Sequence, residues 1–228
     1  MNRFKGILFD FDGTLANTLG DHFLAWQAVM KNYSVDLKPK DYYPLEGIPM
    51  PELAKRFMVK AGDDSPTESL IKDLVKQKEN YYLQHHRFEF YPGVESFVDT
   101  LWKTGILIAI VTASYRDRMR KSVPGDFLDK FNALVDGKET LRGKPHPDPY
   151  LKGAEALRLD PAQCIVIENA PLGVESAKNA GAYCIAVCST LDRSSLRKAD
   201  EVVSAFSELA SLGVIRNLLR GSPKIGRL

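Results

Sequence analysis

The sequence has few cysteines, no long apolar run and almost no net charge, and each of these absences excludes a class of protein. Its three cysteines, Cys164, Cys184 and Cys188, form no CxxC pair and have no companion histidine cluster. This argues against a zinc site and favours buried, reduced thiols over disulfides. No apolar run approaches the roughly 18 residues that cross a bilayer. The formal net charge of +2 gives no reason to expect nucleic acid or a membrane surface as partner.

The beginning of the chain leaves no room for a signal peptide, since residues 1–5 lead straight into an apolar run. We therefore expect a cytoplasmic protein. The 228 residues, 44% of them hydrophobic, suffice for one large domain or for a domain with an insert. We expect a monomer or a weak homodimer.

Two kinds of pattern divide the chain. Residues 21–86 show helical periodicity and no convincing strand, which predicts helices over residues 21–31, 51–61 and 68–85. The remainder alternates short β-rich runs with helical stretches. The predicted strands are residues 106–111, 133–135, 164–167 and 184–187, and the predicted helices are residues 94–103, 150–157 and 172–180. Such alternation is typical of a parallel sheet with helices on both faces.

These patterns predict an α/β fold whose core is interrupted, after its first strand, by a small helical insert. We assign residues 1–16 and 88–228 to the core and residues 17–87 to the insert. The chain is expected to cross between the two at residues 13–19 and 87–92. The last residues, 221–228, are expected to form a loose tail.

Two carboxylates follow the first predicted strand. Residues 7–9 form an apolar run that leads into Asp10, Asp12 and Gly13. Residues i and i+2 of a strand lie on one side of it, so both carboxylates project together where the chain leaves the sheet. Adjacent like charges raise each other's proton affinity unless a cation lies between them. The pair suits Mg²⁺, with one aspartate as nucleophile and the other as general acid and base; an acidic turn that caps a helix is the alternative.

Polar groups also follow later strands, at the sheet edge where parallel sheets bind ligands. Residues 112–114 (Thr-Ala-Ser) offer a hydroxyl and backbone N–H groups to an anion, although Ser and Thr also cap helices. Lys144 precedes a predicted helix, although a lone lysine is commonly a solvated charge. Glu168 and Asn169 offer oxygen atoms to a hard cation, although acid–amide pairs also form turns.

Taken together, these segments resemble the four motifs of the haloacid dehalogenase superfamily. Residues 10–15 (Asp-Phe-Asp-Gly-Thr-Leu) resemble the first motif, Thr112 the second, Lys144 the third, and Glu168 with Asn169 the fourth. The match in order and spacing extends from residue 5 to residue 203. Residues 21–26 and 90–94 are similar to segments of the β-phosphoglucomutase-like branch. The resemblance implies a Rossmann-like, three-layer parallel-sheet core in which the helical insert is a small α-helical cap domain.

The resemblance also implies a mechanism. Asp10 attacks phosphorus to form an aspartyl-phosphate, while Asp12 protonates the leaving oxygen and later takes a proton from water. Thr112 and Lys144 hold the remaining phosphoryl oxygens. Mg²⁺ is the implied cofactor, held by Asp10, the backbone carbonyl of Asp12, Glu168 and Asn169. The residues expected around the substrate are Gly13, His22, Glu46, Ala113 and Ser114.

Two positions depart from the family pattern. The family usually has Asp where this chain has Asn169, and the lost charge predicts a weaker or differently completed magnesium site. The sugar-phosphate mutases of this branch carry a Lys-Gly-x-x-Arg segment that grips a second phosphate, and the matching positions here are Glu46 and Met50. A carboxylate repels a distal phosphate, which disfavours a mutase. We hypothesise that Glu46 reaches the magnesium ion when the insert closes on the core; a solvent-facing Glu46 is the alternative.

We therefore expect an enzyme, a magnesium-dependent phosphohydrolase that acts on a small soluble phosphate compound, with pyrophosphate and sugar phosphates as candidates. One alternative is a β-phosphoglucomutase-type hexose phosphate mutase. Another is a non-catalytic phosphate-binding module, which would not need both Asp10 and Asp12. His22 either assists the acid–base cycle or is a plain helix-surface histidine.

Overall fold

The computed structural model describes residues 3–221 and contains one six-stranded sheet in which all strands are parallel. The strand order is β3-β2-β1-β4-β5-β6. The strands are β1 (Gly6–Phe9), β2 (Leu107–Val111), β3 (Ala133–Val135), β4 (Cys164–Glu168), β5 (Tyr183–Val187) and β6 (Glu201–Val203). β1 thus lies between β2 and β4, with Phe9 opposite Ile110 and Ile167. The residues that follow these three strands meet at one edge of the sheet.

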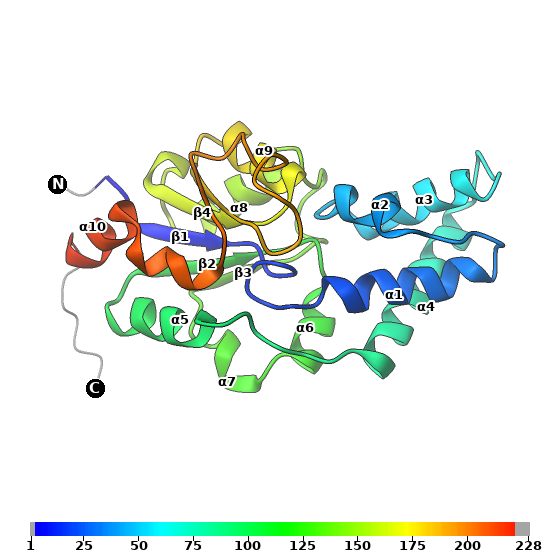
Figure 1. The fold of residues 1–228 in the computed structure, drawn as a ribbon, viewed down its shortest axis with the longest axis horizontal. Coiled ribbons are helices and arrows are strands. Elements are labelled where there is room, and N and C mark those ends of the chain that lie inside the picture. Colours follow the sequence, from blue (N-terminus) through cyan, green and yellow to red (C-terminus); the bar gives the residue numbers. More distant parts are fainter. Residues whose placement is uncertain (1–2, 222–228) are drawn as a thin grey trace.

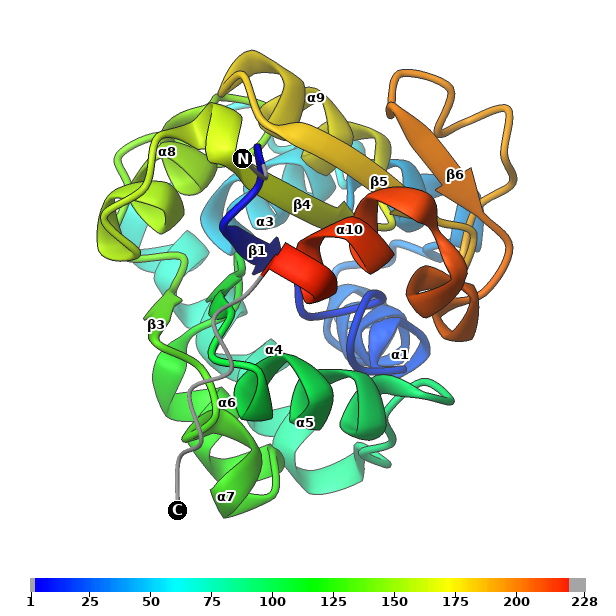
Figure 2. The same cartoon turned by 90° about the vertical axis from the view of Figure 1, so that its left-hand side faces the viewer.

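Helices cover both faces of the sheet (Figure 2). On one side lie α5 (Val94–Lys103) and α10 (Gly213–Gly221), and on the other α8 (Asp148–Ala156) and α9 (Pro171–Asn179). Every residue of β1 is buried: Ile7 and Phe9 join the apolar cluster under α5 and α10, whereas Leu8 joins the cluster under α8 and α9. This alternation follows from the period-two geometry of a strand. The predicted Rossmann-like, three-layer core is confirmed.

The segment between β1 and α5 contains the helical insert, at the end of the molecule toward which β1 points (Figure 1). Its helices are α1 (Leu19–Lys31), α2 (Pro39–Tyr42), α3 (Met50–Lys60) and α4 (Glu68–His85), with a 3₁₀ turn at Tyr43–Leu45. The insert has its own apolar cluster, which includes Trp26, Phe57 and Leu74. This separate cluster supports the proposed division into a core, residues 1–16 and 88–228, and a cap domain, residues 17–87.

The two connections between core and insert run side by side. Ala16 and Phe90 form an antiparallel bridge, and the N–H of Asn17 donates to the carbonyl of Glu89 at 2.9 Å. Both positions lie within the crossings that the sequence predicts, residues 13–19 and 87–92. The backbone pairing means that any movement of the insert must bend both connections together.

The predicted helices and strands are all present, with ends that differ by one or two residues. The sequence patterns missed the short elements α2, α6 (Arg116–Ser122) and α7 (Gly125–Leu128), and also β6 and α10. α2 and α7 have four residues each and β6 has three, which is too short to show a periodic pattern. β6 is held in the sheet by its pairing with β5. The predicted tail, residues 221–228, lies outside the described residues except for Gly221, which ends α10.

Two smaller predictions have mixed outcomes. Cys164 and Cys184 are buried free thiols, as expected, but Cys188 is only partly buried, so the prediction of burial is wrong for it. Cys188 follows the last residue of β5, where the chain emerges from the core. None of the helices within residues 3–221 is long and apolar enough to cross a lipid bilayer.

Helix α8 packs so closely on the sheet that Gly153 has no room for a side chain. A Cβ at this position would lie 2.6 Å from Cγ2 of Val111 and 3.3 Å from Cδ2 of Leu8. We expect Gly153→Ala to lower the free energy of unfolding by about 1–3 kcal/mol, because the helix must shift. The control is Gly20→Ala in α1, where no atom lies within 4 Å and stability should stay level or rise by about 0.5 kcal/mol. Urea denaturation measures both, and equal stabilities would contradict the close packing.

Candidate active site

The end of β1 directs Asp10 and Asp12 toward the helical insert. The N–H of Asp10 still pairs with the carbonyl of Ile167 in β4, at 2.9 Å, and the chain then turns back on itself at residues 11–16. Gly13 has a φ of +88°, and a Cβ there would lie 2.3 Å from Nδ2 of Asn169. Glycine is therefore needed both for the turn and for the close approach, which agrees with the role that the sequence predicts for it.

The ammonium group of Lys144 joins the ends of β1 and β4. Its Nζ donates to Oδ1 of Asp10 and to Oε1 of Glu168, both at 2.6 Å. Oε1 of Glu168 also accepts from the hydroxyl of Tyr150 at 2.8 Å, and its Oε2 accepts from the two backbone N–H groups that follow. Burial alone would lower the pKa of Lys144, but the two carboxylates outweigh it and raise that pKa above its usual value. Lys144 is therefore a permanently charged centre of the site.

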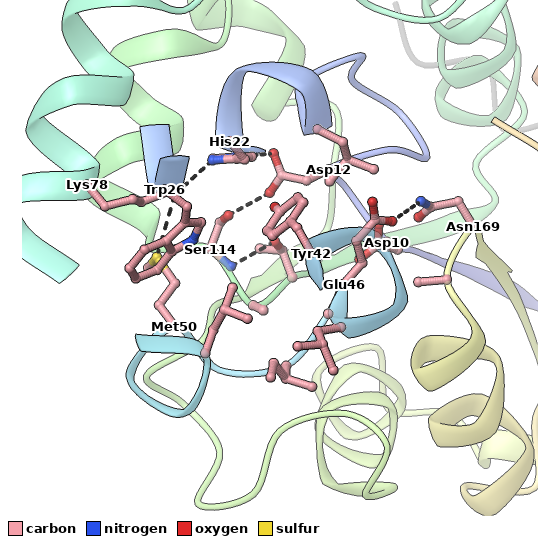
Figure 3. Close-up of a pocket in the computed structure, with 18 residues that line it drawn as sticks. Asp10, Asp12, His22, Trp26, Tyr42, Glu46, Met50, Lys78, Ser114 and Asn169 are labelled. Carbon is pink, nitrogen blue, oxygen red and sulfur yellow. Dashed lines mark hydrogen bonds and ion pairs between the residues drawn. The ribbon is translucent and has the colours of Figure 1, made fainter. Parts of the chain in front are cut away.

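Asp10 lines a small cavity of about 60 Å³, room for only a few water-sized groups (Figure 3). Its Oδ2 is buried and has no hydrogen-bond partner. Burial raises the pKa of Asp10 to about 7, against the opposing effect of Lys144. One oxygen of Asp10 is thus held by the lysine while the other is available to a ligand.

The carboxylate of Asp12, in contrast, is surrounded by donors. Oδ1 accepts from the hydroxyl of Thr18 at 2.7 Å, and Oδ2 from the hydroxyl of Ser114 at 2.5 Å. Nη2 of Arg118 donates to both oxygens, at 3.1 and 2.8 Å, and Nε2 of His22 lies 3.1 Å from Oδ1. Burial alone would raise the pKa of Asp12, but Arg118 and His22 hold it well below its usual value.

The surroundings of His22 determine its tautomer. Nδ1 lies 2.7 Å from Nζ of Lys78, and an ammonium group only donates, so Nδ1 accepts and Nε2 carries the proton that points to Asp12. Burial and the neighbouring Lys78 lower the pKa of His22 to about 4, so the ring is neutral. His22 is 4% exposed and stacks on Tyr82 with ring centres 4.1 Å apart. The interpretation of His22 as a helix-surface residue is therefore wrong.

Glu46 of the insert reaches the core and is 4% exposed, so the solvent-facing alternative is wrong. Its Oε2 accepts from Nδ2 of Asn169 at 3.0 Å and lies 3.4 Å from the hydroxyl of Thr190, while its Oε1 has no partner. Oδ1 of Asn169 accepts from the hydroxyl of Thr14 at 3.0 Å, which orients the amide group toward Glu46. Burial, followed by the neighbouring carboxylates Asp10 and Glu168, raises the pKa of Glu46 to about 9.

Most of the site residues predicted from the sequence line this one cavity. Those in its wall are Asp10, Asp12, His22, Glu46, Thr112, Ala113, Ser114 and Asn169. Gly13, Lys144 and Glu168 are not in the wall and lie behind it, in contact with Asn169, with Asp10 and with Lys144 respectively. Thr112 accepts a hydrogen bond from the N–H of Ser114 at 3.0 Å, which holds that loop in shape. The predicted substrate and metal roles of all these residues stay predictions.

Sequence reasoning missed four polar residues that hold the site together: Thr18, Lys78, Arg118 and Thr190. Lys78 left a signal, because it occupies a position of the buried stripe of α4 that is otherwise apolar. Arg118 and Thr190 left none, since each lies in a short polar segment that only the tertiary structure brings to the site.

The donor set fits a hard divalent cation such as Mg²⁺. Oδ2 of Asp10 and Oε1 of Glu46 are buried carboxylate oxygens without partners, and a cation would offset the burial and the neighbouring carboxylates that raise the pKa of each. No three His, Cys, Asp or Glu side chains within residues 3–221 are grouped so as to hold a metal ion. Backbone carbonyl, amide and water oxygens would have to complete the coordination, as Mg²⁺ commonly allows. Both oxygens of Glu168 are already engaged, so its role as ligand stays a prediction.

The family model for haloacid dehalogenase-like hydrolases matches residues 7–187, a segment that contains all four motifs. The chain belongs to this family. Hexitol phosphatase A of Escherichia coli K12 is 32% identical over 211 residues, which cover 91% of this chain and 94% of the relative. A candidate pyrophosphatase of Caldanaerobacter subterraneus is 27% identical over 189 residues, 81% of this chain and 82% of the relative. A solved structure of a candidate β-phosphoglucomutase from Bacteroides vulgatus has a TM-score of 0.84 at 27% identity, over 95% of this chain and 90% of its own.

The hydroxyl of Tyr150 tests how strongly the hydrogen bonds to the buried Glu168 side chain stabilise the fold. A hydrogen bond to a buried charge is worth about 1.5–3 kcal/mol, so Tyr150→Phe should lower the free energy of unfolding by that amount. The matched control is Tyr183→Phe, which removes a 2.9 Å hydrogen bond to Glu201 at a partly exposed position and should cost about 1 kcal/mol or less. Chemical denaturation compares the two, and equal losses would contradict a stronger hydrogen bond at the buried Glu168 than at Glu201.

Proposed function

We propose that this haloacid dehalogenase-like hydrolase is a magnesium-dependent phosphohydrolase that forms an aspartyl-phosphate on Asp10 and acts on a compact phosphate compound. The proposal is supported above all by the different hydrogen bonding of the two carboxylate oxygens of Asp10. One of its oxygens is fixed by Lys144 at 2.6 Å, and the other is unpartnered in a small buried cavity. A carboxylate in this arrangement suits a nucleophile.

In the first step, Oδ2 of Asp10 attacks phosphorus and the bond to the leaving oxygen breaks. Asp12 lies beside Asp10 and, in its protonated form, supplies the leaving oxygen with a proton; because Arg118 and His22 favour its ionised form, it must first take up a proton. In the second step, Asp12 takes a proton from the water that attacks the aspartyl-phosphate, which releases phosphate and restores Asp10. Mg²⁺, when bound, would neutralise phosphoryl oxygens. The hydroxyl of Thr112 and the backbone N–H of Ala113 belong to residues that line the cavity and would orient those oxygens.

Two features of the insert support a compact substrate. Glu46 and Met50 both line the cavity, at the positions where the resemblance to sugar-phosphate mutases calls for two cations. Without those cations, a second phosphate at the far end of a sugar has no binding group from these positions. The cavity of about 60 Å³ is also small for a hexose phosphate. Pyrophosphate is compact and itself a magnesium ligand, which makes it the first substrate to test.

The names of two similar proteins point to two different substrate classes, sugar-alcohol phosphates and pyrophosphate. Hexitol phosphatase A is the relative at 32% identity, and its name indicates a sugar-alcohol phosphate, whereas the relative at 27% identity is named for pyrophosphate. The buried position of Glu46 favours the compact compound. Hexitol and hexose phosphates therefore belong in the same substrate panel as the alternative.

Asp10→Asn should abolish turnover, since the amide is nearly isosteric but a poor nucleophile.

Asp12→Ala should lower kcat roughly 100-fold or more, and the loss should be smaller for an aryl phosphate, whose leaving group needs little protonation. Release of free phosphate with Mg²⁺, and its loss on adding a chelator, is the measurement. Asp64→Asn, an exposed aspartate of the insert, is the control and should match wild type. An active Asp10→Asn variant would refute the mechanism, and a phosphorylated product without free phosphate would indicate a mutase.

Glu46 tests the choice of substrate. We expect wild type to prefer pyrophosphate over hexose and hexitol phosphates, and Glu46→Ala to weaken that preference. Glu46→Gln keeps the size of the side chain and separates the effect of charge from that of shape. Glu52→Ala, on the exposed side of α3, is the control and should change nothing. A wild-type preference for hexose phosphates, or a Glu46→Ala variant with unchanged preference, would contradict the compact-substrate proposal.

A further inference from the structure

Arg118 is a buried arginine that lies outside the four sequence motifs. It makes more hydrogen bonds to Asp12 than any other side chain does. It lies on α6 and is 2% exposed. Its Nη2 donates to both carboxylate oxygens of Asp12, at 3.1 and 2.8 Å. Arg118 is not in the wall of the cavity that Asp10 lines, so it would act on a substrate only through Asp12.

The other side of Arg118 faces helix α4 of the insert. Its Cζ lies 4.9 Å from the ring centre of Tyr82, and its Nε lies 3.9 Å from Oε2 of Glu79. Glu79 also accepts from Lys78 at 2.8 Å, and Tyr82 stacks on His22. The guanidinium group therefore lies between Asp12 of the core and one turn of α4, Glu79 to Tyr82, and it can keep its contacts to α4 only while the insert rests on the core.

Packing alone does not explain an arginine at this position. Nε and Nη1 of Arg118 are buried and have no hydrogen-bond partner, and a buried charge left partly unpaired destabilises a fold relative to an apolar side chain of similar size. The contacts that Arg118 does make are those to Asp12 and to the face of α4. The hydrogen bonds of Arg118 therefore serve to orient the carboxylate of Asp12.

We propose that Arg118 is a positioning residue that fixes the carboxylate of Asp12 and, through Glu79 and Tyr82, makes this positioning depend on closure of the helical insert. The proposal rests on the function proposed above, in which Asp12 transfers protons. A catalytic group has to be held close to its productive geometry, and a misplacement of about 1 Å lowers the rate roughly 100-fold. Arg118 restrains both oxygens of Asp12 at once, which a hydroxyl donor does not do.

The test is a double-mutant cycle between Arg118 and Asp12, measured with an aryl phosphate so that Asp12→Ala keeps a measurable rate. Arg118→Met should lower kcat roughly 10- to 100-fold with little change in KM, because Arg118 does not contact the cavity. In the Asp12→Ala background the same substitution should cause no further loss. Arg118→Lys keeps one charged donor and should restore part of kcat. An Arg118→Met variant with wild-type kcat, or an equal loss in both backgrounds, would overturn the proposal.

The dependence on the insert has its own measurement, which needs no turnover. Hydrogen exchange of the backbone amides of α4 should become faster in Arg118→Met, because a contact between insert and core is lost. Arg120→Met is the matched control, since Arg120 is an exposed residue of the same helix and should change neither kcat nor exchange. Unchanged exchange in Arg118→Met would overturn the link to the insert. An inactive wild type or an active Asp10→Asn variant would instead refute the proposed function, and the exchange result would still decide whether Arg118 holds the insert.

Discussion

The rest of the site depends on the two ion pairs that the ammonium group of Lys144 forms with Asp10 and Glu168. This group is buried between Asp10 at the end of β1 and Glu168 at the end of β4, at 2.6 Å from each. Two buried carboxylates this close together require a cation, because desolvation and mutual repulsion would otherwise protonate one of them. The insert also rests on this side chain, since a Cβ at Gly47 would lie 3.0 Å from Cδ of Lys144. One lysine thus connects two strand ends and the insert.

The two aspartates of the first motif have opposite surroundings, although only one residue separates them. Asp10 lies among carboxylates, with Glu46 and Glu168 near it, and keeps one oxygen without a partner. Asp12 lies among donors, and both of its oxygens are occupied. Such a difference in environment is how two chemically identical groups acquire different roles. Here it separates a candidate nucleophile from a candidate proton-transfer group.

The helical insert contributes side chains to both surroundings, which explains how one family scaffold can serve different substrates. Glu46 completes the carboxylate-rich side, and His22 with Lys78 completes the donor-rich side. The core supplies Asp10, Asp12 and Lys144 from the ends of its own strands and loops. The substrate therefore depends on side chains that the insert adds to those of the core, and the fold by itself does not specify it.

The sequence by itself determined the layered α/β core, the position of the insert and the identity of most polar residues of the cavity. It could do so because strand and helix periods are local properties of the chain, and because parallel strands bring their carboxyl ends to one edge of the sheet. Only the tertiary structure decided that Glu46 and His22 are buried, that Asn169 donates to Glu46, and that Arg118 holds Asp12. Glu46 and Asn169 are 123 positions apart in the chain, and Arg118 and Asp12 are 106 apart. No local period relates such residues, so both contacts exist only in the folded tertiary structure, and the contact between Glu46 and Asn169 also requires the insert to pack on the core.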